Sequence, residues 1–361
     1  MSTVIQVVQH LRPGGIETMA LDLASFAREH EKHLIVSLEG NRKQAITQWP
    51  RLAPYASQLI FLEKGSGLKP ALIFRLAGLF RKIKADVVHT HHIGPLLYAG
   101  LASRLAGVKR LIHTEHDAWH LHDPHRRTLQ RWAIKFTHPR LVADARTVAN
   151  AMKQWLHQDD IYIVHNGIDT ERFKPGDQAA ARNQLGLPAH VKLVGCSGRL
   201  EEVKGQHVLI DALANMPYDT HLALAGDGSA KDALRRQTQT EGLSDRVHFL
   251  GHLDDMPSFY QALDVFCLPS FNEGLPLSPL EAQACGIPTV VTDVGGAREA
   301  LCLLSGKLIP SGDVGKMANA LNITLRQRKY GFNIDPRHFI KHQRDVRLMV
   351  QAYTDLHHPG V

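Results

Sequence analysis

The sequence predicts an α/β protein with two doubly wound domains, each a parallel sheet covered by helices. Its 361 residues exceed one ordinary core and suit two domains of roughly 150–180 residues each. Short apolar runs alternate with amphipathic helical patterns through both halves, which is typical of parallel βα units. Polar loops containing glycine follow several of these runs, where doubly wound sheets bind their ligands.

The N-terminal half contains seven expected strands, and we assign it to a domain over residues 1–168. Amphipathic helices separate the strands, and the first helix has Met19, Leu23 and Phe26 on one face. A segment with glycine and proline at 166–178 is the best candidate for a linker. The expected strands are Val4–Val8, Leu34–Leu38, Leu59–Leu62, Asp86–His89, Arg110–His113, Leu141–Ala143 and Ile161–Val164.

The C-terminal half repeats this pattern over residues 169–335. The apolar run Val265–Leu268 reads as a buried parallel strand, and Lys307–Ile309 is expected at an edge of the sheet. A last helix, about Pro336–Leu356, is expected within residues 336–361. The remaining expected strands are Lys192–Cys196, His221–Ala225, Val247–Leu250 and Thr289–Thr292.

The stretch that follows Val265–Leu268, PSFNEGLPLSPLEAQACG, combines a loop, a helix start and two carboxylates. Glu273 is expected in the loop and Glu281 inside the helix. The N–H groups at a helix start attract anions, and a carboxylate one or two turns later can accept hydrogen bonds from sugar hydroxyls. The alternative is that both glutamates are ordinary solvated charges, because spacing alone does not establish a site.

Two further loops have residues suited to phosphate. Gly14-Gly15 follows the first strand, where backbone can approach a ligand closely, although a glycine pair is a weak signal by itself. In the second half, Arg199 and Lys204 flank a loop with glycine at the end of a strand. Two cations in such a loop can meet a diphosphate.

Histidines gather in HTHH at 89–92 and in HTEHDAWHLHDPH at 113–125. Neither run has a fixed metal-ligand spacing and no cysteine lies near, so we expect no metal site, with zinc or iron as the minor alternative. A neutral histidine such as His116 can instead donate to a sugar hydroxyl or a phosphate. The four cysteines lack CxxC spacing and are expected to be reduced packing residues in a cytosolic protein.

The positive charge is concentrated in the N-terminal half. Residues 1–168 contain 22 Lys and Arg against 13 Asp and Glu, whereas the remainder contains 20 against 22. This asymmetry favours an anionic partner such as lipid headgroups, a phosphorylated glycan or nucleic acid, or else marks a merely soluble basic surface. An amphipathic basic helix around Arg126–Phe136 fits a membrane surface or its own domain equally well. No apolar run is long enough to span a bilayer, and no basic segment of the signal-peptide type begins the chain.

Taken in order, nine stretches resemble the family 4 retaining glycosyltransferases (group 1), which have the GT-B fold of two Rossmann-like domains facing a cleft. The resemblance is dense from about 190 to 325 and sparser, but ordered, before that. Pro279 and Gln283 stand where bulky apolar residues are more common in the family. The stretches are GGIE at 14–17, HTEHD at 113–117, NGID at 166–169, GRLEEVKG at 198–205, AGDG at 225–228, ALDVFCLPS at 262–270, the E-x7-E pair at 273–281, ACGIPTVVTDVGG at 284–296 and SGDVGKMANAL at 311–321.

The resemblance implies that the C-terminal domain binds a nucleotide sugar, UDP-linked in our reading, and that the N-terminal domain binds the acceptor. It also implies that the last helix crosses back onto the N-terminal domain. The implied catalytic residues are His116, Arg199, Lys204 and Glu273. The implied donor-binding residues are Gly14, Gly15, Gly198, Arg199, Lys204, Glu273, Gly274, Leu275 and Glu281, and those touching the acceptor or the sugar are Glu17, His91 and Asp117.

The resemblance further implies transfer with retention of anomeric configuration and without a metal or other cofactor, and the sequence contains no DxD motif. Together with the basic N-terminal half, it suggests a glycan or lipid-linked acceptor in cell-surface polysaccharide or lipopolysaccharide biosynthesis. We expect the protein in the cytoplasm, at the inner face of the cytoplasmic membrane. The alternatives are a GT-B epimerase or phosphorylase, and a non-enzymatic protein that binds anionic lipid. No nucleic-acid-binding pattern is present, so we expect no such partner.

Overall fold

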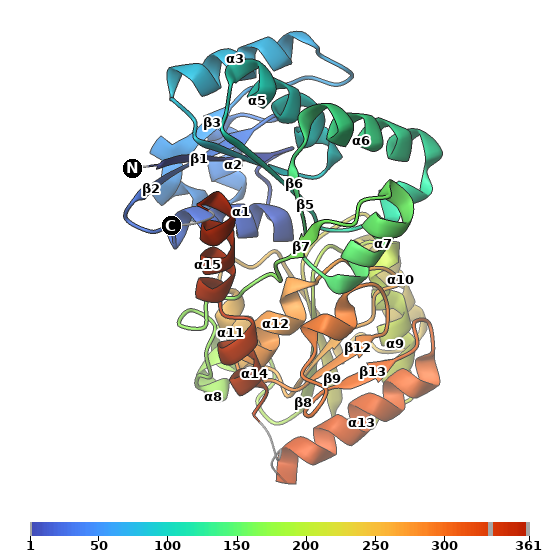
Figure 1. Ribbon diagram of the computed structural model, residues 1–361. Coiled ribbons are helices and arrows are strands. Elements are labelled where there is room, and N and C mark those ends of the chain that lie inside the picture. The colour runs from blue at the N-terminus through green and yellow to red at the C-terminus, as the bar shows by residue number, and fades with distance from the viewer. Residues whose placement is uncertain (1, 331–334, 359–361) are drawn as a thin grey trace. The chain divides into compact units, whose positions relative to one another are not determined.

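The computed structural model describes residues 2–330 and 335–358. It divides into two compact units, one formed by Met1–Asn166 with Val346–Val361 and the other by Gly167–Asp345 (Figure 1). We call these the N-terminal unit and the C-terminal unit. The expected linker segment is ordered within the C-terminal unit, where Phe173 is buried against the ring of Tyr260.

The described part of the N-terminal unit contains a seven-stranded parallel sheet in the order β3-β2-β1-β4-β5-β6-β7. Its strands are runs of branched apolar residues, which suit a sheet buried on both faces. In β1, Val4 and Val8 pack on one side, while Ile5 and Val7 pack on the other. The strands are β1 Ser2–Val8, β2 Glu31–Ser37, β3 Leu59–Phe61, β4 Val87–His91, β5 Arg110–Glu115, β6 Arg140–Ala143 and β7 Ile161–Ile163.

Helices cover both faces of this sheet, because both faces bury apolar side chains. Ile5 and Val7 contact a cluster that includes Leu76 and Phe80 of α3, and Val4 contacts a cluster formed with α1 and α15. The helices are α1 Gly15–Ser25, α2 Arg42–Gln48, η1 Pro50–Gln58, α3 Ala71–Lys82, α4 Ile93–Pro95, the π-helical η2 Leu96–Gly100, α5 Leu101–Ala106, η3 Trp119–His122, α6 Pro124–Thr137, α7 Arg146–Leu156 and α15 Val346–His357.

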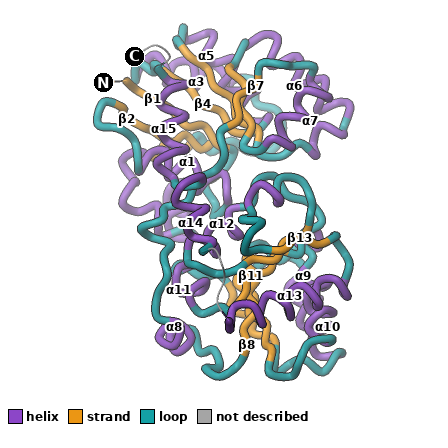
Figure 2. The backbone as a smooth tube through the Cα atoms, turned by 60° about the horizontal axis from the view of Figure 1, so that its bottom comes forward, coloured by secondary structure: helices purple, strands orange, loops and turns teal. Residues whose placement is uncertain are grey.

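Among the described residues of the C-terminal unit, a six-stranded parallel sheet runs in the order β10-β9-β8-β11-β12-β13. Figure 2 labels β8, β11 and β13 of this sheet. The strands are β8 Lys192–Ser197, β9 Thr220–Ala225, β10 Val247–Gly251, β11 Val265–Leu268, β12 Thr289–Thr292 and β13 Lys307–Ile309. The helices are α8 Gln178–Gln184, η4 Glu202–Lys204, α9 Gln206–Ala214, α10 Lys231–Thr240, α11 Met256–Gln261, α12 Leu277–Ala284, η5 Ala297–Ala300, α13 Val314–Tyr330 and α14 Pro336–Gln343. The expected α/β class with two doubly wound parallel sheets is confirmed.

The C-terminal segment differs from the single helix expected over Pro336–Leu356. It forms two helices, α14 in the C-terminal unit and α15 in the N-terminal unit, and the chain passes between the units after Asp345. The helical conformation is interrupted at Asp345, because its carboxylate accepts a hydrogen bond from Thr170 and its backbone forms a β-bridge with Ile168. The unit boundaries fall at 166/167 and 345/346, whereas the sequence predicts domain boundaries at 168/169 and 335/336.

All four cysteines are buried and free. Burial raises the pKa of the thiols of Cys196 and Cys285 to about 12, so both stay protonated at neutral pH. No helix in the described part of the chain combines the length and the apolar character that a membrane span requires.

Candidate functional site

Each sheet has one place where the strand order reverses, and the loops that leave the two strands there diverge. In the C-terminal unit this place lies between β8 and β11. Ligands of doubly wound sheets bind at such switch points, beyond the carboxyl ends of the strands. The loops after β8 and β11 contain Lys204 and Glu273, so the topology brings together two residues that lie 69 positions apart.

Lys204 and Glu273 form an ion pair, with 2.7 Å between Nζ and Oε1. Ser270 donates a second hydrogen bond to the same oxygen, at 2.6 Å. The Glu273 side chain is 7% exposed and that of Lys204 is 19% exposed, so a partly dry environment strengthens their attraction. The sequence predicted both residues for the donor site. It did not indicate that they form an ion pair, nor that Ser270 donates a hydrogen bond to Glu273.

Glycines hold the Glu273 loop tightly between its neighbours. At Gly295, where φ is +50°, a Cβ would lie 1.8 Å from the backbone oxygen of Glu273. At Gly205, where φ is +67°, a Cβ would lie 2.1 Å from the backbone oxygen of Pro269. Any side chain at these positions would clash with backbone and would also occupy a disfavoured φ. The loop position of Glu273 is therefore fixed from both sides.

Arg199 lies in the loop after β8 and has a 65% exposed side chain that pairs with Glu201 at 2.6 Å. Gly198 precedes it with φ at +139°, a conformation that favours glycine. Gly274 and Leu275 lead from Glu273 toward α12, whose cap residue Pro276 provides no side-chain hydrogen bond to the helix start. Exposed cationic charge and an uncapped helix start at one sheet edge suit an anionic ligand.

Glu281 of α12 belongs to a buried hydroxyl chain that joins three elements. The hydroxyl of Tyr260 in α11 donates to Glu281 at 2.5 Å, so the hydroxyl of Ser197 at the end of β8 must donate to Tyr260, at 2.9 Å. Burial and the charge of Glu281 raise the pKa of Tyr260 well above its ordinary value, which keeps it a donor. Tyr260 orients the carboxylate, a role that its apolar sequence surroundings did not indicate.

In the N-terminal unit the strand order reverses between β1 and β4. Gly14 precedes α1, which begins at Gly15, and has an extended φ of −169°. A Cβ on Gly14 would lie 2.4 Å from Oε2 of Glu17, so glycine here makes room for the chain's own carboxylate. Glu17 is buried, and its Oε1 lies 3.1 Å from Nδ1 of His10, whose side chain is 41% exposed.

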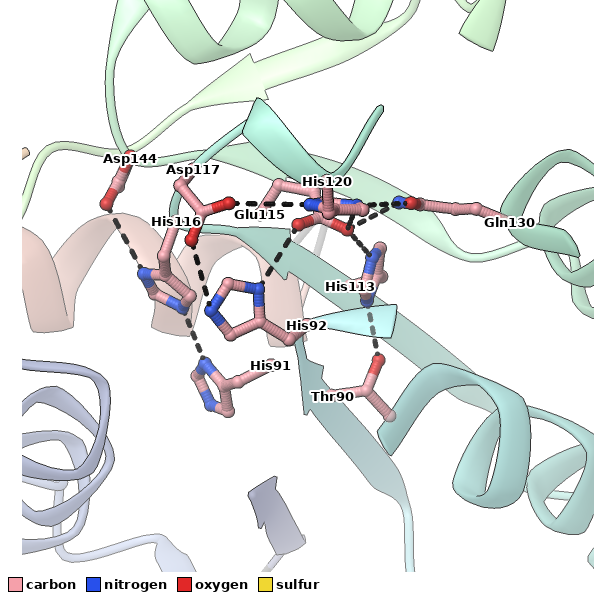
Figure 3. A network of polar contacts seen from close by, with 10 residues as sticks. All are labelled: Thr90, His91, His92, His113, Glu115, His116, Asp117, His120, Gln130 and Asp144. Atoms are coloured by element: carbon pink, nitrogen blue, oxygen red, sulfur yellow. Dashed lines mark hydrogen bonds and ion pairs between the residues drawn. The ribbon is translucent and has the colours of Figure 1, made fainter. Parts of the chain in front are cut away.

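His91 and His116 lie inside the unit, joined in a chain that ends at Asp144 (Figure 3). Burial lowers the pKa of His116 to about 3, so its ring is neutral at physiological pH. Because the carboxylate of Asp144 only accepts, His116 donates through Nδ1 and accepts at Nε2 from Nδ1 of His91, over 3.3 Å and 3.0 Å. Both nitrogens of His116 are thus engaged, and His91 is 1% exposed.

Among the histidines of β4 and of the loop that follows it, His92 reaches the surface, with a 29% exposed side chain. Its Nδ1 lies 3.5 Å from Oε2 of Glu115, and its Nε2 lies 3.6 Å from Oδ2 of Asp117 (Figure 3). Burial lowers the pKa of His92, but its interactions with Glu115 and Asp117 outweigh this and raise it. The sequence indicated Asp117 and the buried His91, whereas the exposed histidine is the next residue along.

His120 completes this group. Burial opposes its charge, but Asp117 and Glu115 raise its pKa to about 9, so it is a cation at neutral pH. Its Nδ1 lies 3.4 Å from Oδ1 of Asp117, and its Nε2 lies 2.7 Å from the amide oxygen of Gln130. His92, Glu115 and His120 also form a group whose potential metal-ligand atoms lie within 4.8 Å of one another.

Comparison with known proteins identifies the family. Residues 177–345 match the family model described as Glycosyl transferases group 1, and residues 13–172 match that of Glycosyltransferase Family 4. The two matches follow one another and take in most of both units. The chain belongs to this glycosyltransferase family. The resemblance recognised from the nine sequence stretches is confirmed.

The curated relatives include D-inositol 3-phosphate glycosyltransferase of Mycobacterium sp. (strain JLS), which is 33% identical over 265 residues. The match takes in 66% of this chain and 59% of that protein, so the chain spans less than two thirds of the relative's length.

Among solved structures, Anabaena Alr3699/HepE in complex with UDP-glucose has a TM-score of 0.84 at 25% identity, over 99% of both chains. The apo lipopolysaccharide outer core galactosyltransferase WaaB has a TM-score of 0.72 at 18% identity, over 98% of both chains. The similarity to WaaB establishes the fold alone. Two Rossmann-like parallel-sheet domains with these neighbours have the expected GT-B fold.

Proposed function

We propose that this glycosyltransferase moves a hexose from a UDP-sugar to a glycan or lipid-linked glycan, with retention of configuration and without a metal ion in the reaction. The observation that carries the proposal is the Lys204–Glu273 pair at the β8/β11 switch point. A 25% identical protein with the same fold has been solved with UDP-glucose, which supports this choice of donor.

The chemistry follows from the charges at the edge of the C-terminal sheet. Transfer releases a nucleoside diphosphate, whose leaving oxygen gains negative charge as the glycosidic bond breaks. Lys204 and the exposed Arg199 supply positive charge there, and fixed cations at a developing anion lower the barrier. Glu273 orients Lys204 and accepts hydrogen bonds from sugar hydroxyls, while Glu281, oriented by Tyr260, accepts from the ribose. For retention, the acceptor attacks from the face of the leaving phosphate, which takes the acceptor proton.

The transfer reaction can be measured as release of UDP from UDP-sugars in the presence of membrane extract. We expect Lys204→Ala and Glu273→Gln each to lower kcat/KM roughly 10²–10³-fold, the usual loss when a fixed group that stabilises transition-state charge is removed. Lys192→Ala is the matched control, because Lys192 forms an exposed ion pair with Asp219 and should leave turnover unchanged. Unchanged turnover in both site variants would contradict the site, and isomerisation or phosphate dependence without transfer would contradict the reaction.

We also propose that the N-terminal unit binds an anionic membrane surface through α6, at the inner face of the cytoplasmic membrane. The helix exposes Leu129, Trp132 and Phe136, of which Trp132 and Phe136 are in ring contact at 4.7 Å. Its basic residues include Arg131 and Lys135, which line a surface pocket next to it. Apolar side chains beside cations match the boundary between acyl chains and anionic headgroups. Such a location would bring the acceptor unit to a lipid-linked substrate.

Vesicle flotation tests this membrane proposal. At low salt we expect the chain to float with anionic vesicles but not with neutral ones, and to dissociate as salt rises because screening weakens headgroup attraction. Trp132→Ser with Phe136→Ser should lower the bound fraction several-fold. Tyr218→Ser, which removes a 78% exposed aromatic from the C-terminal unit, is the control. Equal flotation of both variants would remove α6 as the binding element.

A further inference from the structure

In the histidine group at the carboxyl ends of β4 and β5, His92 and His120 lie farther from the carboxylate of Glu115 than a short hydrogen bond requires. Nδ1 of His92 lies 3.5 Å from Oε2 of Glu115, and Nε2 of His120 lies 3.9 Å from Oε1 of the same carboxylate. Good N–H···O hydrogen bonds are about 2.7–3.2 Å long. Two ligands of a tetrahedral zinc ion lie about 3.3 Å apart, given metal–ligand bonds of about 2.0–2.1 Å. The observed spacings are nearer to a metal site than to a set of hydrogen bonds.

Oε2 of Glu115 lies in this space, 3.5 Å from Nδ1 of His92. Its side chain is 0% exposed, and its two sound hydrogen bonds, from His113 and Gln130, both go to Oε1. Oε2 is buried and has no hydrogen-bond partner among the described residues. An unsatisfied carboxylate oxygen in the interior is costly, and a cation placed beside it removes that cost.

Asp117 supplies the outer contacts that metal-bound histidines usually have. Its Oδ2 lies 3.6 Å from Nε2 of His92, and its Oδ1 lies 3.4 Å from Nδ1 of His120. These are the ring nitrogens that point away from Glu115 (Figure 3). A carboxylate beside the second nitrogen of each ring favours the tautomer and orientation that metal binding needs.

His92 is held in this arrangement by a strained backbone. Its φ of 69° and ψ of 165° lie in a region that is essentially restricted to glycine. A metal ion at Nε2 of His120 takes the place of the ring proton that faces the amide oxygen of Gln130, 2.7 Å away, because a metal-bound imidazole nitrogen is deprotonated. An amide oxygen is itself an acceptable ligand for a divalent ion.

We infer that His92, Glu115 and His120 form a binding site for a divalent transition-metal ion of the zinc class, oriented by Asp117. His and carboxylate ligands suit zinc and its neighbours in the first transition row. The partly exposed His92 leaves one side of the ion open to solvent or to a ligand atom. The ion is assigned no part in bond cleavage. It orders the loops after β4 and β5, in which the acceptor residues were expected.

Metal binding to the full-length, untagged chain can be followed with Co²⁺, which absorbs visible light strongly in a tetrahedral site, and with Zn²⁺ as competitor. We expect saturation at about one ion per chain, the stoichiometry of a single tetrahedral site. His92→Gly and Glu115→Gln should abolish the signal, and Asp117→Asn should weaken binding roughly 10–100-fold. His92→Gly keeps the fold, because glycine adopts this backbone conformation without strain.

The matched control is His358→Gln, which alters a second group of ligand-type residues around Glu31 and should leave the Co²⁺ signal intact. The inference is overturned if Co²⁺ binds without saturation, if His92→Gly binds it like the wild type, or if His358→Gln abolishes binding instead. Circular dichroism of each variant separates a lost ligand from a lost fold. The readout does not involve turnover, so its outcome is independent of the proposed transfer reaction.

Discussion

At the scale of single residues, the hydroxyl of Tyr260 has the most testable role outside the charged pair. It is fully buried, donates to Glu281 and accepts from Ser197, so its removal takes one hydrogen bond from each of these two side chains. We expect Tyr260→Phe to lower the free energy of unfolding by about 1–3 kcal/mol, the usual cost of losing buried hydrogen bonds of which one is to a charged group. Urea unfolding would measure it, with Tyr218→Phe as the exposed control. An unchanged midpoint for Tyr260→Phe would show that the chain of hydroxyls is not a structural link.

The residues of the site could be predicted from sequence only where a local motif exposes them. Glu273, Lys204 and Arg199 lie in polar loops after apolar runs, and those loops indicated them. Their pairing depends on the adjacency of β8 and β11, which no local pattern records. Ser270, Tyr260 and His92 were missed for the same reason, since each acquires its partner from another element. The roles of the predicted residues in catalysis and binding stay predictions until variants are measured.

At the scale of elements, a buried carboxylate links α15 to β2. Glu31 begins β2, and its Oε1 lies 2.9 Å from Nδ1 of His357 at the end of α15. Burial alone would raise the pKa of Glu31, but hydrogen bonds from His33 and His357 hold it well below its ordinary value. Burial lowers the pKa of His357 more than Glu31 raises it.

Both shifts predict that acid loosens α15. A carboxyl group whose folded pKa is depressed contributes stability above its unfolded pKa of about 4.5, and that stability is lost as pH falls below it. A histidine with a depressed folded pKa acts in the same direction below about 6.5. We therefore expect hydrogen exchange in α15 to accelerate between about pH 6.5 and 4. Glu31→Gln should flatten this dependence, whereas Glu29→Gln, an exposed neighbour, should not. Exchange that is independent of pH after correction for its intrinsic rate would contradict the prediction.

Strands were the most predictable elements, because a parallel strand buried on both faces is a short apolar run. Helices with few apolar residues were not predicted from the sequence. In α10, KDALRRQTQT, only Leu234 and Thr238 are buried, so the sequence shows little periodicity. The break between α14 and α15 could not be predicted either, because it depends on contacts of Asp345 with the chain near Thr170, which lies 175 residues away.

At the scale of the whole molecule, the two units should unfold separately, and the chain contains a natural reporter for one of them. Four hydrophobic clusters of buried side chains, one in the C-terminal unit and three in the N-terminal unit, each lie within a single unit. All four tryptophans, at 49, 119, 132 and 155, lie in the N-terminal unit. Tryptophan fluorescence therefore follows that unit, whereas circular dichroism follows both.

If the donor site belongs to the C-terminal unit, UDP should stabilise that unit alone. A ligand at about 100 times its Kd stabilises the folded state by about 2.7 kcal/mol. We expect UDP to raise the temperature of the dichroism transition that belongs to the C-terminal unit. The transition seen by tryptophan fluorescence should stay in place. Lys204→Ala should abolish the shift, because the diphosphate loses its partly buried cation, and Lys192→Ala should retain it. A tryptophan transition that moves as far as the dichroism transition would contradict the assignment of the donor site to the C-terminal unit alone.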